Sequence, residues 1–177
     1  KEGFSINNVI ITDDGQNIII SNSKGISILD INTGKLINSI SLYGGYEKLQ
    51  IAYNKNDNQI IVGQNIRPRT VKFYDFKTCK QVREFKSHIP MEKLYVSNDY
   101  RFIVLGDHKG FAVFDYKTGA SLFEIEDYIK DFAVSPFHDE LVYCTDIEGS
   151  KENYLKLVDT RTWKTIGSLP NANLDYH

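Results

Sequence analysis

Hydrophobic and polar residues alternate along this chain in short runs that recur in a constant register. In four segments, two apolar residues lie four and two positions before an aspartate: Ile26 and Ile28, Val71 and Phe73, Phe111 and Val113, Leu155 and Leu157. Alternate side chains of a β-strand lie on the same face, so each pair indicates one apolar strand face. The pattern predicts four equivalent strands that end at Asp30, Asp75, Asp115 and Asp159.

The spacing of these aspartates predicts the rest of each repeat. They are 45 (75 − 30), 40 (115 − 75) and 44 (159 − 115) residues apart, which is the length of four short strands with their turns. Two more alternating runs precede each strand, one follows it, and no run has a helical period. We therefore expect an all-β chain of four-stranded antiparallel sheets over about 6–43, 47–88, 91–127 and 130–169, with a tail over 170–177.

A turn motif follows each aspartate. The carboxylate can accept hydrogen bonds from the next backbone N–H groups, and a threonine three residues later can add its hydroxyl. The predicted turn residues are Asp30, Thr33, Asp75, Thr78, Asp115, Thr118, Asp159 and Thr162. The next position holds Gly34 or Gly119 in two turns, where a left-handed backbone costs little, but Cys79 or Trp163 in the others. We expect those two turns to be strained or built differently. For Trp163 we favour packing on the neighbouring sheet over exposure to a partner.

Repeated four-stranded antiparallel units that must stack to bury both faces are typical of a β-propeller. With an apolar residue before each repeat aspartate, the chain resembles the WD-repeat family, or its quinoprotein-like relatives, over essentially its whole length. The four dipeptides are Leu29-Asp30, Tyr74-Asp75, Phe114-Asp115 and Val158-Asp159. It departs from the family in having no Trp before the aspartate, and the family's Gly-His element survives at most as Ser87-His88.

The resemblance also bears on the number of sheets. Propellers close with about four to eight blades, and seven is usual in the WD-repeat family. Because the sequence starts at Lys1-Glu2-Gly3, without an initiator Met or a signal peptide, we interpret it as part of a larger propeller. The remaining blades would belong to the same or a partner chain. The alternative is a ring closed by these four blades alone.

Composition narrows the partners and the compartment. A net charge of −2 gives no basis for a nucleic-acid surface, and the apolar runs are too short for membrane insertion. Two lone cysteines, Cys79 and Cys144, and the absence of an Asn-x-Ser/Thr acceptor favour a cytoplasmic or other intracellular location.

Loops are where a propeller carries recognition residues. Tyr and Arg dominate interface hot spots, so loops rich in these residues are candidate partner-binding sites. The candidates, which could line one rim, are Tyr46, Arg67, Arg69, His88, His108 and Tyr128. We expect the partners to be other proteins.

Chemical sites are weakly supported. His88 and His108 lack a carboxylate partner, and His138 lies at the other end of its repeat, so no metal site is expected. No nucleophile motif occurs, and we expect neither cofactor nor catalysis. The predicted function is a non-catalytic protein-interaction scaffold. The alternatives are a structural subunit of a large assembly and a quinoprotein-like enzyme or ligand-binding propeller.

Overall fold

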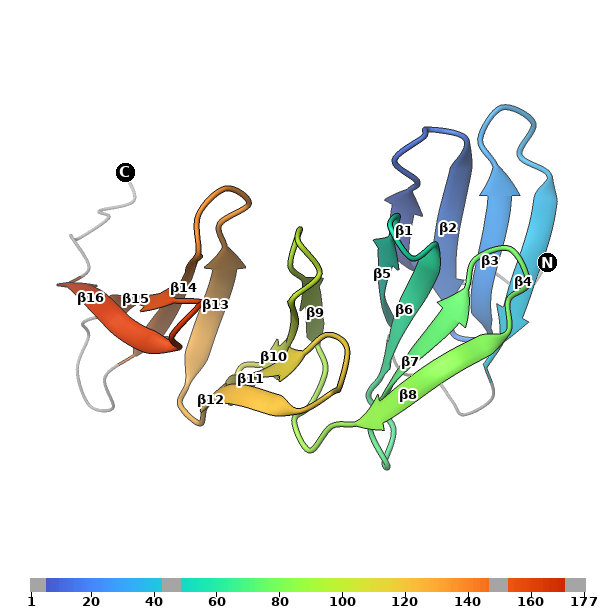
Figure 1. Ribbon diagram of the computed structural model, residues 1–177. Coiled ribbons are helices and arrows are strands. Elements are labelled where there is room, and N and C mark those ends of the chain that lie inside the picture. Colours follow the sequence, from blue (N-terminus) through green and yellow to red (C-terminus); the bar gives the residue numbers. More distant parts are fainter. Residues whose placement is uncertain (1–5, 43–48, 147–152, 171–177) are drawn as a thin grey trace, which may run out of the picture. The chain divides into compact units, whose positions relative to one another are not determined.

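The computed structural model describes residues 6–42, 49–146 and 153–170 (Figure 1). Their strands form four antiparallel sheets of four strands each, and within the described ranges there is no helix. The prediction of an all-β chain of four-stranded antiparallel repeats is confirmed. Across those same ranges, no helix has the length and apolar character that crossing a bilayer requires.

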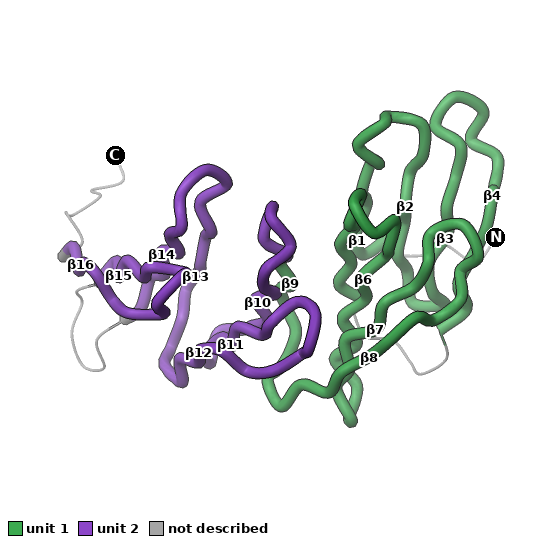
Figure 2. Tube along the Cα trace, in the orientation of Figure 1, with its two compact units in different colours: residues 1–95 green, residues 96–177 purple. Residues whose placement is uncertain are grey.

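The chain divides into two compact units, residues 1–95 and 96–177 (Figure 2). Each unit is described by itself, and the expectation of one propeller region over 1–177 stays a prediction. The sequence predicts a tail over 170–177, but the last strand extends through Pro170. Residues 171–177 lie outside the described part.

The first unit contains two sheets in which strands follow one another in chain order. The first sheet is β1 (Ile6–Ile11), β2 (Asn17–Asn22), β3 (Gly25–Asp30) and β4 (Leu36–Ser41). The second is β5 (Gln50–Asn54), β6 (Gln59–Gln64), β7 (Thr70–Asp75) and β8 (Gln81–Lys86).

The third and fourth sheets repeat this arrangement. The third is β9 (Lys93–Val96), which spans the division at residue 95, with β10 (Phe102–Asp107), β11 (Gly110–Asp115) and β12 (Ser121–Ile125). The fourth is β13 (Ile129–Val134), β14 (Glu140–Asp146), β15 (Asn153–Asp159) and β16 (Lys164–Pro170). Each predicted Asp strand is the third strand of its sheet.

The core of the first unit lies between its two sheets. One cluster joins Ile19, Ile26 and Ile28 of the first sheet to Ile51 and Ile60 of the second. The residues that alternate with Ile19 and Ile28 lie on the opposite face of the first sheet, as strand geometry requires. Stacking therefore buries one face of each sheet against its neighbour.

Aromatic side chains join the third sheet to the fourth in the second unit. The fully buried Phe111 ring lies 5.5 Å from the Phe132 ring and 5.4 Å from the Tyr143 ring, measured between centroids. Phe111 belongs to β11, whereas Phe132 and Tyr143 belong to β13 and β14. Both units thus use the same face-to-face stacking.

Two glycines are required by close backbone approach at the start of the third strand. A Cβ on Gly25 would lie 2.0 Å from the Ile40 carbonyl oxygen, and one on Gly110 would lie 2.1 Å from that of Ile125. Their φ values of 141° and 146° also favour glycine. A side chain at Gly25 or Gly110 would therefore clash with the fourth strand of the same sheet.

Candidate functional site

In all four Asp turns the carboxylate accepts a hydrogen bond from the backbone N–H of the threonine three residues later. Asp30 Oδ1 accepts bonds from the Thr33 backbone N at 2.8 Å and from the Thr33 hydroxyl at 2.7 Å. Thr78 gives both bonds to Asp75 at 2.7 Å, and Thr118 gives them to Asp115 at 2.7 and 2.8 Å. In the fourth turn, Asp159 accepts backbone bonds from Arg161 at 2.7 Å and Thr162 at 3.0 Å. Each carboxylate thereby closes its own turn.

These bonds stabilise the charged form of each aspartate. Hydrogen bonds from the hydroxyl and then the backbone N–H of Thr33 lower the pKa of Asp30, and those of Thr78 lower the pKa of Asp75. For Asp115 the larger cause of the lowered pKa is the Thr118 backbone N–H. The turn aspartates are thus structural groups held ionised.

The residue after each threonine adopts a left-handed conformation in all four turns. Gly34 and Gly119 have φ values of 65° and 72°, and Cys79 and Trp163 have 56° and 54°. Each donates its backbone N–H to the carbonyl of its repeat aspartate at 2.8 to 2.9 Å. Of the two alternatives for Cys79 and Trp163, the structure shows the strained turn rather than a different one.

Trp163 packs on the third sheet. Its ring meets the Phe102 ring edge-on with centroids 5.1 Å apart, and it stacks on the Phe123 ring at 5.8 Å. Cys79 likewise packs against the apolar cluster of the first unit. The packing favoured for Trp163 is what the structure shows.

Three predicted partner-binding residues lie in the first unit. Arg67 is exposed between β6 and β7, and His88 is exposed after β8. The half-buried Arg69 donates to Asn65 Oδ1 at 3.1 Å and to the His88 carbonyl at 3.0 Å, so it joins the two loops. Tyr46 lies outside the described residues.

The other two candidates lie together in the second unit. The rings of His108 and Tyr128 are 6.3 Å apart, and Tyr128 is 53% exposed. Ile129 N donates to the His108 carbonyl at 3.1 Å, which fixes this pair at the end of β10. Among the residues that the structure describes, no group of three or more His, Cys, Asp or Glu could hold a metal ion.

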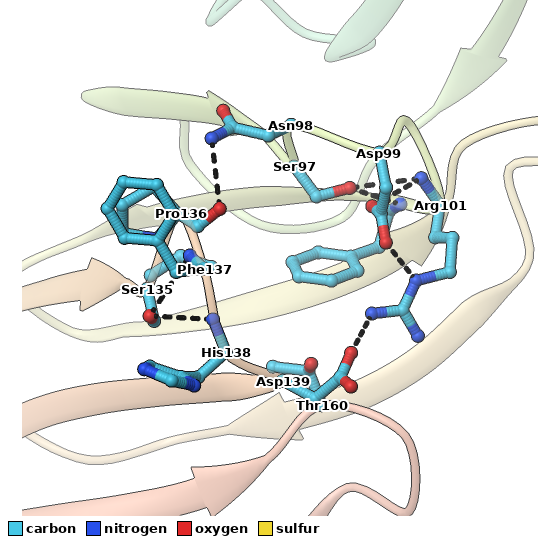
Figure 3. Close-up of a pocket in the computed structure, with 12 residues that line it drawn as sticks. Ser97, Asn98, Asp99, Arg101, Ser135, Pro136, Phe137, His138, Asp139 and Thr160 are labelled. Carbon is cyan, nitrogen blue, oxygen red and sulfur yellow. Dashed lines mark hydrogen bonds and ion pairs between the residues drawn. The ribbon is translucent and has the colours of Figure 1, made fainter.

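At the ends of the third and fourth sheets that lie away from His108 and Tyr128, the chain forms a cavity of about 230 Å³ (Figure 3). The turn between β9 and β10 contributes Asp99 and Arg101, and the turn between β13 and β14 contributes Phe137 and Asp139. Phe137 is 88% exposed, and the Ser135 hydroxyl accepts the backbone N–H groups of Phe137 and His138. Hydrogen bonds therefore hold the backbone of a turn that presents an exposed aromatic side chain at a polar cavity.

Arg101 connects the two turns around this cavity. Figure 3 shows its guanidinium between the carboxylates of Asp99 and Asp139. Arg161 lies 3.3 Å from the second oxygen of Asp139. Burial opposes ionisation of Asp99, but the Arg101 and Ser97 hydrogen bonds outweigh it and lower the Asp99 pKa. The charges around the cavity are satisfied by one another.

Sequence patterns alone did not predict this cluster. Its signals in the sequence are the short polar segment at 98–101 and the Pro136-Phe137 step, each of which by itself indicates only a turn. The Asp139 partner of Arg101 lies 38 residues away in sequence, so the ion pair depends on which sheets stack. A second cavity, of about 420 Å³, shares Arg101 and Phe102 with the first and is also lined by Trp163 and Lys117.

The chain was compared with known protein families, curated proteins and solved structures. No protein-family model and no curated protein matches the chain. Among solved structures it is similar to Kuenenia stuttgartiensis hydrazine synthase, at 15% identity and a TM-score of 0.74 over 94% of this chain and 49% of that chain. It is also similar to the WD40 domain of Neurospora crassa Pan2, at 18% identity and a TM-score of 0.69 over 94% of this chain and 52% of that chain.

These similarities define the fold. The four sheets have the architecture of β-propeller blades, as the resemblance to the WD-repeat family implied, in a form without Trp before the repeat aspartates. The chain spans about half the length of both structures. At this level of identity the likeness concerns the fold alone.

Proposed function

We propose that this chain is a non-catalytic protein-interaction module whose partners contact the loops between its strands. The observation that carries the proposal is the 88% exposure of Phe137 on a turn fixed by Ser135. A large exposed aromatic side chain loses little conformational entropy when a partner buries it, because it has only two rotatable side-chain bonds. A preorganised anchor of this kind favours binding.

The surroundings of Phe137 favour a protein as the partner. Arg101 and Asp139, which line the same cavity as Phe137, supply charged groups of both signs, and Arg161 lies beside Asp139. An aromatic anchor with a mixed polar border is typical of protein interfaces, in which aromatic side chains and Arg carry much of the binding energy. The predicted rim residues His108 and Tyr128 form a second aromatic pair, at the end of β10.

The experiment compares binding by matched variants. The purified chain, immobilised and incubated with an intracellular extract, should retain a defined set of proteins identified by mass spectrometry. Phe137→Asp should lower their recovery at least about tenfold, as expected for loss of a hot spot. Val82→Asp changes an equally apolar exposed residue on β8 and should leave recovery unchanged. Equal recovery by both variants would reject Phe137 as the anchor.

The rim prediction is tested in the same way. His108→Ala and Tyr128→Ala test the rim residues separately from Phe137. His108 and Tyr128 lie at one end of the strands of the third and fourth sheets, and Phe137 lies at the other end. If neither Phe137→Asp nor the rim variants changes recovery, the interaction proposal fails. The alternative is an enzymatic or ligand-binding propeller, because an enzyme, hydrazine synthase, is among the proteins with this fold. Saturable binding of a small molecule or metal by the purified chain would support that alternative instead.

A further inference from the structure

The first sheet carries a row of apolar residues across all four strands, exposed on the two outer strands and partly buried on the two inner ones. In the strand register Ile11 pairs with Ile18, Ile18 with Leu29, and Leu29 with Leu36. Ile11 is 57% and Leu36 61% exposed, and Val9, two residues away on the same face, is 56% exposed. This face is opposite the one that packs in the first unit. A four-residue apolar row across a sheet is typical of a face that becomes covered.

The fourth sheet exposes apolar residues on the face opposite Phe132 and Tyr143. Leu155 pairs with Leu169, and these side chains are 38% and 66% exposed. Cys144, the other neighbour of Leu155, and Leu157 extend the same face. The second unit therefore also carries one packed and one exposed apolar face.

The two exposed faces correspond by register to the two halves of an interface seen in the second unit. Phe111, four residues before Asp115, contacts Phe132 and Tyr143. Leu155 occupies the position of Phe111, four residues before Asp159. Ile20 in the first sheet corresponds to Tyr143 in the fourth. Each of these two residues pairs with the residue that lies three positions before the repeat aspartate of its own sheet. Val9 pairs with Ile20 as Phe132 pairs with Tyr143, so Val9 and Ile20 are the corresponding partners.

The first unit contains the same contact. Ile26 lies four residues before Asp30 and shares one buried cluster with Ile51 and Val62. Val62 pairs with Lys72, three residues before Asp75, and Ile51 pairs with Val62. Both units therefore pack a residue of the third strand against a pair on the first and second strands of the next sheet.

We propose that the fourth sheet of one copy of this chain packs on the first sheet of a second copy, head to tail, with Leu155 against Val9 and Ile20. Each copy presents both halves of the interface, so the exposed face of its first sheet and that of its fourth sheet can each be covered by a second copy. Two copies together also match the length of the structures that the chain resembles, since one copy covers 49% and 52% of them. Two copies contribute eight sheets, a number within the range of about four to eight blades with which propellers close. This proposal is independent of the partner surface around Phe137.

The test is the mass of the chain by light scattering behind size exclusion. A second copy predicts about 41 kDa, twice 20.3 kDa, with dissociation on dilution. Val9→Asp and Leu155→Asp should each give a 20.3 kDa species that retains the strand signal in circular dichroism, because both residues are exposed within a single copy. Val82→Asp is the control and should remain dimeric. A wild-type chain that stays at 20.3 kDa at high micromolar concentration overturns the proposal.

Mixing the two variants tests the orientation. The Val9→Asp copy keeps an intact fourth sheet, and the Leu155→Asp copy keeps an intact first sheet. A head-to-tail contact predicts that the mixture regains a species of about 41 kDa through one intact interface, although each variant alone is monomeric. Pairing of like faces predicts instead that each variant dimerises alone through its unaltered face. That result, or a mixture that stays monomeric, overturns the head-to-tail contact.

Discussion

The ring of Trp163 stacks on that of Phe123 with centroids 5.8 Å apart and planes inclined by 20°. Phe123 belongs to β12, whereas Trp163 occupies the turn between β15 and β16. A residue with an unfavourable backbone conformation thus contributes to the contact between two sheets. The strain at φ 54° is offset by aromatic packing.

This offset predicts different changes in the free energy of unfolding for two glycine substitutions. Trp163→Gly relieves about 1 kcal/mol of left-handed strain but loses aromatic contacts of greater value, so we expect net destabilisation of about 1 to 2 kcal/mol. Cys79→Gly relieves the same strain and loses only a half-buried thiol, so we expect a change within about 0.5 kcal/mol. Urea unfolding of both variants measures the difference. Equal effects would contradict a packing role for Trp163.

The close-approach glycines give a second prediction. Gly110→Ala places a Cβ 2.1 Å from a backbone oxygen, which forces β11 and β12 apart and should cost about 3 kcal/mol or more. Gly34→Ala meets no atom within 4 Å and should cost only the left-handed strain, about 1 kcal/mol. Thermal and urea unfolding compare the pair. If Gly34→Ala were the more damaging change, the strand pairing described for β11 and β12 would be wrong.

The turn aspartates predict a dependence of stability on pH. Their pKa values are lowered in the folded state, so their contribution is fully present above the unfolded pKa and is lost as the pH falls through the folded pKa. Stability should therefore decrease below about pH 4. Asp30→Asn should flatten this decrease in urea midpoints measured between about pH 2 and 6. Ser121→Ala, an exposed change that removes no titratable group, is the control and should leave the slope as in the wild type.

The Arg101 ion pairs should contribute little to stability and should respond to salt. Arg101 and Asp139 are partly exposed, with 44% and 36% of their side-chain surface accessible, so water and ions screen the pair. A double-mutant cycle with Arg101→Ala and Asp139→Ala should give a coupling below about 1 kcal/mol at low salt and less at about 1 M salt. A coupling of several kcal/mol that is independent of salt would contradict this account.

Local patterns were sufficient to predict the architecture. Alternation around Asp30, Asp75, Asp115 and Asp159 marks strands directly, because each sheet has one strongly apolar face. The turn chemistry is local as well, since each carboxylate bonds to residues two and three positions later. Sequence could therefore indicate four four-stranded repeats without information on their stacking.

The cavity and the close-approach glycines depend on longer-range relationships. Arg101 and Asp139 meet only because the third sheet stacks on the fourth. Gly25 and Gly110 precede the apolar pairs of β3 and β11, but the equivalent position of β7 holds Thr70, so no repeated glycine marks the site. Trp163 could be predicted only in part. The sequence indicates its unusual place in the turn motif, but it does not indicate its packing partners Phe102 and Phe123.

The most direct test of the central claim, that successive sheets stack face to face as propeller blades, is a double-mutant cycle between Phe111 and Tyr143. Their rings are 5.4 Å apart and come from neighbouring sheets. Phe111→Leu and Tyr143→Leu, alone and together, should show a coupling of about 0.5 to 1.5 kcal/mol in urea unfolding, as expected for a buried aromatic pair. Strictly additive effects would mean that the third and fourth sheets do not pack through these faces, and would contradict the account.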